Sequence, residues 1–315
     1  MRRPRSERMP VGAAGIWHIT SRCVRRERLL ESVGSRAWLA ERLAAWFGVL
    51  AVDLLGYALM GNHLHLVVRT RPDVARGWTA TEVRRRWLAS LRVSDGGPAA
   101  LEALGERLDA DDLAHARAIL AHPGIMLRAV KEGFARRLNR QQDTAGHVWE
   151  SRYHDVAVID AGGVLACLVY VDLNPLRAGL VTLPADGLFC SARHRLQVDR
   201  QAPDAALGSR LCRLDGHPLL DARGIERGSW SWDSKAVAEL TLATARLIQG
   251  QAQSLPAWAE DLLPRLGVVR SAWVTGMAVG GSISGNVLGS HAVRRHAAGS
   301  GRMTSDKSGW FGEVE

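Results

Sequence analysis

The chain has 315 residues, of which 47% are hydrophobic and 23% charged, a globular composition that excludes wholesale disorder. No apolar run approaches the roughly 18 residues of a membrane-spanning helix, and the N-terminus lacks the apolar stretch of a secretory signal. The net charge of +9, with 41 basic residues of which only three are lysines, favours a polyanionic partner over a membrane. Four cysteines without paired spacing favour reduced thiols and a cytoplasmic location.

The first half of the chain alternates between strand and helix patterns. Alternation of apolar and polar residues predicts a strand over 17–24, and apolar residues at helical spacing predict a helix over 35–50 with Ser35 as its N-cap. Two further strands, 51–60 and 63–70, are separated by Gly61-Asn62, which is a two-residue hairpin signal. A second helix is predicted to begin near Thr79.

The second half begins with a turn-rich segment, 94–124, that reads as an insertion between core elements. A basic helix over 126–141, a strand over 152–160 and an apolar helix over 162–174 follow, and Pro175 is expected to end that last helix. Beyond residue 185 the pattern predicts helices, followed by a Gly- and Ser-rich tail that we expect to be mobile. The predicted helices of this part are 234–250, 256–266 and 270–279.

This order of elements predicts an α+β fold built on a ferredoxin-like antiparallel sheet with helices on one face, followed by a helical C-terminal extension. The predicted boundary divides the chain into a domain of residues 1–184, with the insertion at about 94–124, and an extension of residues 185–315.

Basic residues gather in two places. Residues 1–28 hold eight arginines against two glutamates, and the helix over 126–141 carries five basic residues against one glutamate. Such clusters are typical of nucleic-acid binding, although a run of charge can equally be a solvated face. The candidates for phosphate contacts are Arg22, Arg25, Arg26, Lys131, Arg136, Arg137 and Arg140.

The sharpest local motif is His63-Leu64-His65 on a predicted strand. Side chains at i and i+2 of a strand point to the same face, so both imidazoles can reach one metal ion. A chance pair on a polar strand face is the alternative interpretation.

The chain has three tyrosines, and they read differently. Tyr57 lies in an apolar strand and reads as core, whereas Tyr153 stands between Arg152 and His154. Tyr170 precedes Asn174 by one helical turn, so the two share a helix face. Tyr170 is therefore either a packing residue or a nucleophile placed beside a metal-ligating amide.

Three blocks of the sequence resemble one family. GYALMGNHLHLVV is similar to the strand that bears the His-hydrophobe-His motif of single-tyrosine HUH transposases, except that Gly61 stands where the family has proline. GHVWESRYHDVAVIDAGGVLACLVYVDLNPLRAGLV resembles the tyrosine-bearing segment of REP-associated tyrosine transposases, and GIWHITSRCVRRERLL resembles their first strand and basic loop. The blocks fall in the family's order and cover most of residues 10–197.

The resemblance implies a DNA strand transferase that acts on single-stranded or hairpin DNA, as a monomer or a homodimer. It implies that Tyr170 attacks a phosphodiester to give a 5′-phosphotyrosine link. It also implies that His63, His65 and Asn174 ligate a divalent metal, Mg²⁺ or Mn²⁺, which polarises the phosphate.

Two other classes stay open at this stage. One is a catalytically silent DNA-hairpin-binding protein of the same fold, and the intact set of His63, His65, Tyr170 and Asn174 argues against it. The other is a zinc hydrolase, which would need further ligands at a recognisable spacing.

Overall fold

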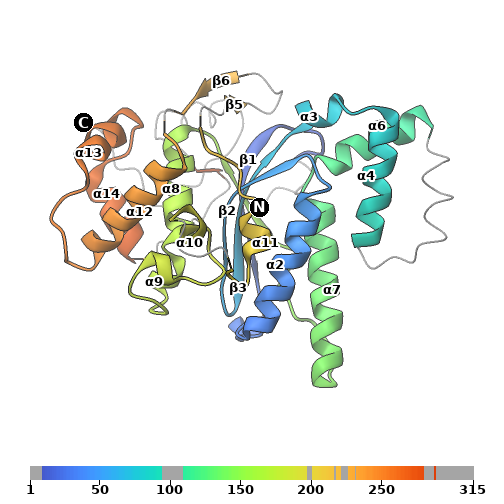
Figure 1. Ribbon diagram of the computed structural model, residues 1–315, viewed down its shortest axis with the longest axis horizontal. Helices are drawn as coiled ribbons and strands as arrows, with labels where there is room; N and C mark the ends of the chain where they lie inside the picture. Colours follow the sequence, from blue (N-terminus) through green and yellow to red (C-terminus); the bar gives the residue numbers. More distant parts are fainter. Residues whose placement is uncertain are drawn as a thin grey trace, which may run out of the picture.

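The computed structural model describes residues 9–93, 109–196, 201–215, 218–220, 226–230, 232–279 and 287–288. It has a mixed α/β fold whose four central strands form an antiparallel sheet in the order β2-β3-β1-β4 (Figure 1). These strands are β1 (Gly15–Arg22), β2 (Val52–Leu59), β3 (His63–Thr70) and β4 (His154–Val158). A two-residue strand, β7 (Val287–Leu288), pairs parallel with β4.

The helices lie in two layers, and the bounds of the longer ones follow the predicted pattern closely. On the first half of the chain they are η1 (Val24–Arg26), α2 (Val33–Phe47), α3 (Pro72–Arg76), α4 (Ala80–Val93), α6 (Ala110–Leu120) and α7 (Gly124–Gln142). Those that follow are α8 (Ala161–Asp172), α9 (Asn174–Arg177), η2 (Pro184–Asp186), α10 (Ser191–Arg195), α11 (Ala205–Gly208), α12 (Ser234–Ile248), α13 (Ala257–Arg265) and α14 (Arg270–Val279). A separate hairpin consists of β5 (Pro218–Leu220) and β6 (Glu226–Ser229).

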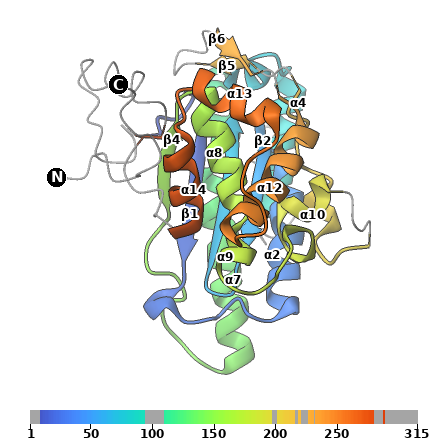
Figure 2. The same ribbon diagram turned by 90° about the vertical axis from the view of Figure 1, so that its left-hand side faces the viewer.

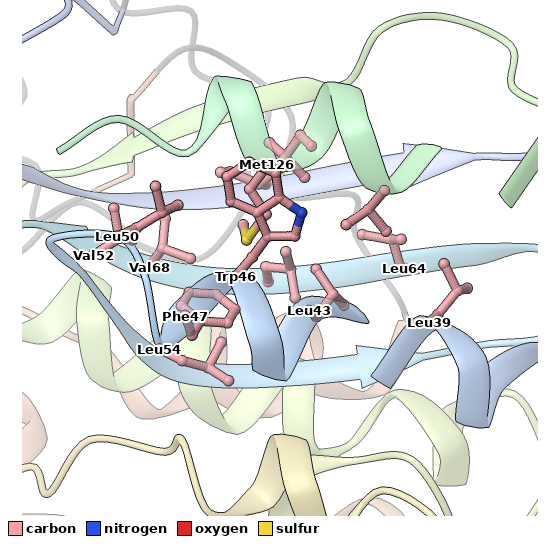
Figure 3. Packing of buried hydrophobic residues seen from close by; sticks show 14 of the residues in the cluster. Leu39, Leu43, Trp46, Phe47, Leu50, Val52, Leu54, Leu64, Val68 and Met126 are labelled. Carbon is pink, nitrogen blue, oxygen red and sulfur yellow. The ribbon is translucent and has the colours of Figure 1, made fainter. Parts of the chain in front are cut away.

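One face of the sheet packs against α2 and α7. Figure 3 shows Leu43, Trp46 and Phe47 of α2 against the strand residues Leu54 and Val68. The helix begins one turn earlier than predicted because Ser32, rather than Ser35, is the N-cap, and the Ser32 hydroxyl accepts the backbone N–H of Ser35 at 3.0 Å.

The opposite face packs against α8, which corrects the expectation of helices on one face alone. Figure 2 shows α8 in front of the strands, and α12 and α14 nearer to the viewer than α8. Alternate residues of β3 explain the two layers, since Leu64 and Leu66 belong to the hydrophobic cluster beneath α2 while Val67 belongs to the one beneath α8. A sheet that is apolar on both faces must be covered on both.

The segment after residue 184 also packs against this core. Phe189 O accepts the backbone N–H of Leu59 at 2.9 Å, and Cys190 forms a bridge to Ala58 of β2. Residues of α12 and α14 share one hydrophobic cluster with α8, including the fully buried Trp273. The division of the chain at residue 184 stays a prediction, and the cluster crosses it.

Two expectations fall partly or wholly outside the described residues. Of the predicted insertion, residues 94–108 lie outside them, while α6 packs against α3 and α4. The Gly- and Ser-rich tail lies outside them except for β7. Among the described helices, none is long and apolar enough to cross a membrane.

Candidate active site

His63 and His65 lie at the start of β3, on the face of the sheet that α8 covers. Their ring centroids are 4.8 Å apart with nearly perpendicular planes. The Nδ1 of His63 lies 2.6 Å from Oδ1 of Asn62, an oxygen that can only accept, so His63 carries its proton on Nδ1 and presents the lone pair of Nε2. The Nε2 of His65 is buried and has no hydrogen-bond partner among the described residues.

A third histidine completes this cluster, and the sequence analysis did not single it out. His18 is on β1, the neighbouring strand, and its Nε2 lies 2.8 Å from Nδ1 of His65. The two rings are stacked, with centroids 5.0 Å apart. When His65 donates this bond, its Nε2 is left with a free lone pair, which is the state that binds a metal ion.

Burial keeps all three imidazoles neutral near pH 7. The pKa of His18 is lowered to about 3, by burial first and by His63 second. The pKa of His63 is lowered to about 4, by burial and by the nearby charge of Arg22. Burial also lowers the pKa of His65 well below its ordinary value.

Tyr170 faces the histidines from α8. The Asp160 side chain caps this helix by accepting the backbone N–H of Gly163 at 2.7 Å, and the helix ends at Asp172, before Pro175. The Tyr170 ring is 5.9 Å from the ring of His65 and 6.1 Å from that of His18, edge-on to both.

Asn174 begins the short helix α9 and is also buried. Its amide nitrogen donates to the backbone carbonyl of Tyr170 at 3.0 Å, which leaves Oδ1 as the atom available to a cation. The described residues contain no group of three or more His, Cys, Asp or Glu side chains placed to hold a metal ion. The atoms of the predicted ligands that could bind a cation are the Nε2 atoms of His63 and His65 and the amide oxygen of Asn174.

The guanidinium group of an arginine lies against the ring of Tyr170. The guanidinium carbon of Arg177 is 4.4 Å from the centroid of the Tyr170 ring. The sequence offered no spacing signal for this residue, because α8 ends at Asp172 and Arg177 lies on the separate helix α9. For His18 the signal was the alternation of WHITSR, which puts His18 on one face of a strand but does not name its neighbour.

The other two tyrosines lie elsewhere. Tyr153 is buried in the hydrophobic cluster beneath α2 and α7, on the far face of the sheet from His63 and His65. Tyr57 is fully buried, as predicted, and its hydroxyl donates to Asp204 at 2.7 Å.

Six of the seven predicted phosphate contacts have side chains that reach the surface. Arg22, Arg25 and Arg26 are exposed in and after the last residue of β1, and Arg22 pairs with His63 in the sheet register. Arg136, Arg137 and Arg140 are on α7 and form no ion pair with the described residues. The C-terminal end of α7 and the α9 turn lie at the same lower end of the molecule in Figures 1 and 2.

Lys131 differs from this set. It is 7% exposed, its ammonium donates to the backbone carbonyl of Ser151 at 2.6 Å, and it lies 5.2 Å from the centre of the Trp149 ring. A phosphate contact would require it to give up this buried bond, so the structure does not favour Lys131 as a DNA ligand.

Comparisons with known proteins found a partial match to one solved structure. No protein-family model and no curated protein sequence matches this chain. The solved structure of a REP-associated tyrosine transposase bound to a REP hairpin is 14% identical, and the match covers 61% of this chain and 85% of that one with a TM-score of 0.36. Similarity at this level assigns neither family nor activity, so the function must be argued from the side chains.

Proposed function

We propose that this chain is a single-tyrosine DNA strand transferase of the REP-associated HUH transposase type. The single observation that carries the proposal is the meeting of Tyr170 with His63 and His65 on one face of the sheet, next to a buried and unpartnered Nε2 of His65. The strand order β2-β3-β1-β4, with α2 and α7 on one face, supports a ferredoxin-like description of the core.

Tyr170 would act as the nucleophile. Its hydroxyl attacks phosphorus of a single-stranded DNA phosphodiester and loses its proton, the Oη–P bond forms, and the P–O3′ bond breaks as the leaving oxygen takes up a proton. The product is a 5′-phosphotyrosine and a free 3′-hydroxyl. Because the ester keeps the energy of the broken bond, a second 3′-hydroxyl can reverse the step.

His63, His65 and Asn174 would hold a divalent cation, Mg²⁺ or Mn²⁺. Such a cation, when bound, polarises the phosphate and takes up charge that develops on it. Neutral imidazoles are the form that ligates a metal, and burial keeps His63 and His65 neutral at physiological pH.

The exposed arginines support a DNA partner. Arg22 pairs with His63 in the sheet register, and Arg25 and Arg26 follow it on the exposed turn η1, where they would meet the backbone of a strand that enters the site. Phosphate contacts carry no sequence information, so recognition of a hairpin would come from its stem shape and its unpaired bases. The proposal holds for a monomer or a homodimer in the cytoplasm.

The test is a cleavage reaction on hairpin-bearing single-stranded oligonucleotides with Mg²⁺ or Mn²⁺. The oligonucleotides carry a label at the 5′ end or at the 3′ end, and the products are separated on a denaturing gel. We expect the 3′-labelled fragment to migrate with the protein and the 5′-labelled fragment to be released with a 3′-hydroxyl.

Two other results would point elsewhere. Retention of the 5′ label on the protein would mean the opposite polarity of attack and would contradict the proposal. Tight hairpin binding without an adduct, for either metal and several hairpins, would favour the catalytically silent DNA-hairpin-binding protein.

A further inference from the structure

Arg177 is a partly buried cation without a carboxylate. Its Nε and Nη1 atoms are inaccessible to solvent and have no hydrogen-bond partner among the described residues, which also offer it no ion pair. Buried charges in proteins are ordinarily paired, because an unpaired one loses its hydration without compensation.

Two arginines of the sheet region that are more deeply buried than Arg177 follow that rule. Arg69 forms an ion pair with Asp53, and Arg195 forms one with Asp172. Each lies against its carboxylate with a side chain no more than 4% exposed. Arg177 differs from both, since the described part of the chain gives it no carboxylate and leaves two of its buried nitrogens without a hydrogen-bond partner.

The position of Arg177 indicates which anion its guanidinium would bind. The guanidinium lies over the ring of Tyr170 at 4.4 Å, and the ring of His65 is 5.9 Å from that same tyrosine. Tyr170 thus lies between two groups that lack hydrogen-bond partners. One is a guanidinium, which binds anions, and the other is an imidazole nitrogen, which can bind a cation. A phosphodiester bound to a divalent cation would satisfy both.

We infer that Arg177 is a second catalytic residue, whose guanidinium binds a non-bridging oxygen of the scissile phosphate while Tyr170 attacks. This inference rests on the proposed function. During the Oη–P bond formation and P–O3′ bond breakage described above, Arg177 keeps its proton and donates hydrogen bonds to the phosphate, which gains charge on its equatorial oxygens. Removal of one such preorganised donor costs roughly 10²–10³ in rate in comparable sites.

The experiment compares the wild type with Arg177→Met on two oligonucleotides. Methionine keeps an unbranched chain against the Tyr170 ring but removes the guanidinium. One oligonucleotide has an ordinary scissile phosphodiester, and the other has a methylphosphonate there, in which a methyl group replaces a charged oxygen. If Arg177 neutralises that charge, Arg177→Met slows single-turnover cleavage of the phosphodiester by about 10²-fold or more. The same variant slows cleavage of the neutral methylphosphonate by less than about tenfold.

A merely structural role predicts a different pattern, with both substrates slowed equally, and that result would overturn the inference. Equal rates for wild type and Arg177→Met on the phosphodiester would overturn it as well. The matched control is Arg86→Met, because Arg86 also stacks on an aromatic ring, at 4.2 Å from the centre of Trp78, and lies on α4. Failure of the proposed function is distinguishable, since the wild type would then form no adduct with the phosphodiester.

Discussion

In the proposed site, the imidazole of His18 would act through His65 rather than on DNA. Its Nε2 can accept the Nδ1 proton of His65, which fixes the tautomer that leaves Nε2 of His65 open. His18→Phe keeps an aromatic ring in the β1 position but removes the hydrogen bond. We expect the Mn²⁺ concentration for half-maximal cleavage to rise by roughly 10–100-fold, the usual cost of losing such a partner.

The control for this prediction is His122→Asn. His122 accepts the backbone N–H of Gly124 at the turn before α7, on the far face of the sheet. The His122→Asn substitution should leave the Mn²⁺ concentration for half-maximal cleavage unchanged. A His18→Phe enzyme with the wild-type Mn²⁺ requirement would show that the bond to His65 has no such role.

The sequence predicts which residues lie side by side where their spacing within one strand or helix determines it. His63 and His65 share a face because strands alternate, and Tyr170 and Asn174 are adjacent because one helical turn separates them. His18 and Arg177 could not be placed in the same way, since the His18–His65 contact spans 47 positions and depends on the register of two strands. The burial of Lys131 was not predicted, because its helix is basic on average while its own position faces inward.

The helix that carries Tyr170 is anchored by a buried polar network. Asp172 at its end accepts from Arg195 and from the hydroxyl of Ser191, both on α10, and Arg195 also donates to the backbone carbonyl of Leu55 on β2. The side chain of Asp172 is fully buried, which raises its pKa despite the opposing charge of Arg195. The network ties α8 to α10 and to the sheet.

Asp172→Asn should therefore be strongly destabilising. It removes the carboxylate that forms an ion pair with Arg195 and leaves a buried guanidinium uncompensated, at a cost of about 3–5 kcal/mol in the free energy of unfolding. Ser191→Ala leaves the ion pair in place and should cost less, about 1–3 kcal/mol. Urea denaturation measures both, and an equal or reversed order would contradict the anchoring role of the ion pair.

Helix and strand bounds were predicted well, and their arrangement was predicted less well. The helices α12, α13 and α14 begin and end within two residues of the expected positions, since apolar periodicity is a local signal. The second helical layer was not predicted. The apolar run of α8 is compatible with a helix that is exposed on one side and also with a helix that is buried on all sides. Which face of the sheet a helix covers depends on contacts far apart in the sequence.

The molecule as a whole is held together across the predicted boundary at residue 184. Cys190 lies beyond that boundary yet is fully buried against β2 and α8, and Cys167 on α8 is fully buried as well. Burial raises the pKa of both thiols far above the ordinary value. A thiol that stays protonated and enclosed reacts slowly with alkylating agents.

Alkylation of the native protein with iodoacetamide near the ordinary thiol pKa of about 8.5 tests this packing. We expect Cys212, which is partly exposed, to be modified first, and Cys167 and Cys190 to react only when the protein unfolds. Peptide mass spectrometry over a time course assigns the order. Early modification of Cys190 would mean that the segment after residue 184 separates readily from the sheet.

The basic surface should act through charge rather than through chemistry. Arg136→Ala with Arg137→Ala removes two cations from α7, and each lost phosphate contact should reduce the slope of log affinity against log salt by about 0.7–0.9. Fluorescence anisotropy with a labelled hairpin measures this slope. Lys235→Ala removes an exposed cation of α12 and is the matched control. If the double arginine substitution left the slope of log affinity against log salt unchanged, α7 would not be part of the DNA-binding surface.

Identification of the residue that carries the DNA adduct tests the function most directly. After reaction with the hairpin oligonucleotide and Mg²⁺, the protein is digested with trypsin and with nuclease, and the modified peptide is sequenced by mass spectrometry. Our proposal predicts a nucleotide joined through its 5′-phosphate to Tyr170. The adduct should be lost in Tyr170→Phe, while hairpin affinity stays unchanged, and it should persist in Tyr153→Phe. An adduct on Tyr153 that survives Tyr170→Phe would contradict it.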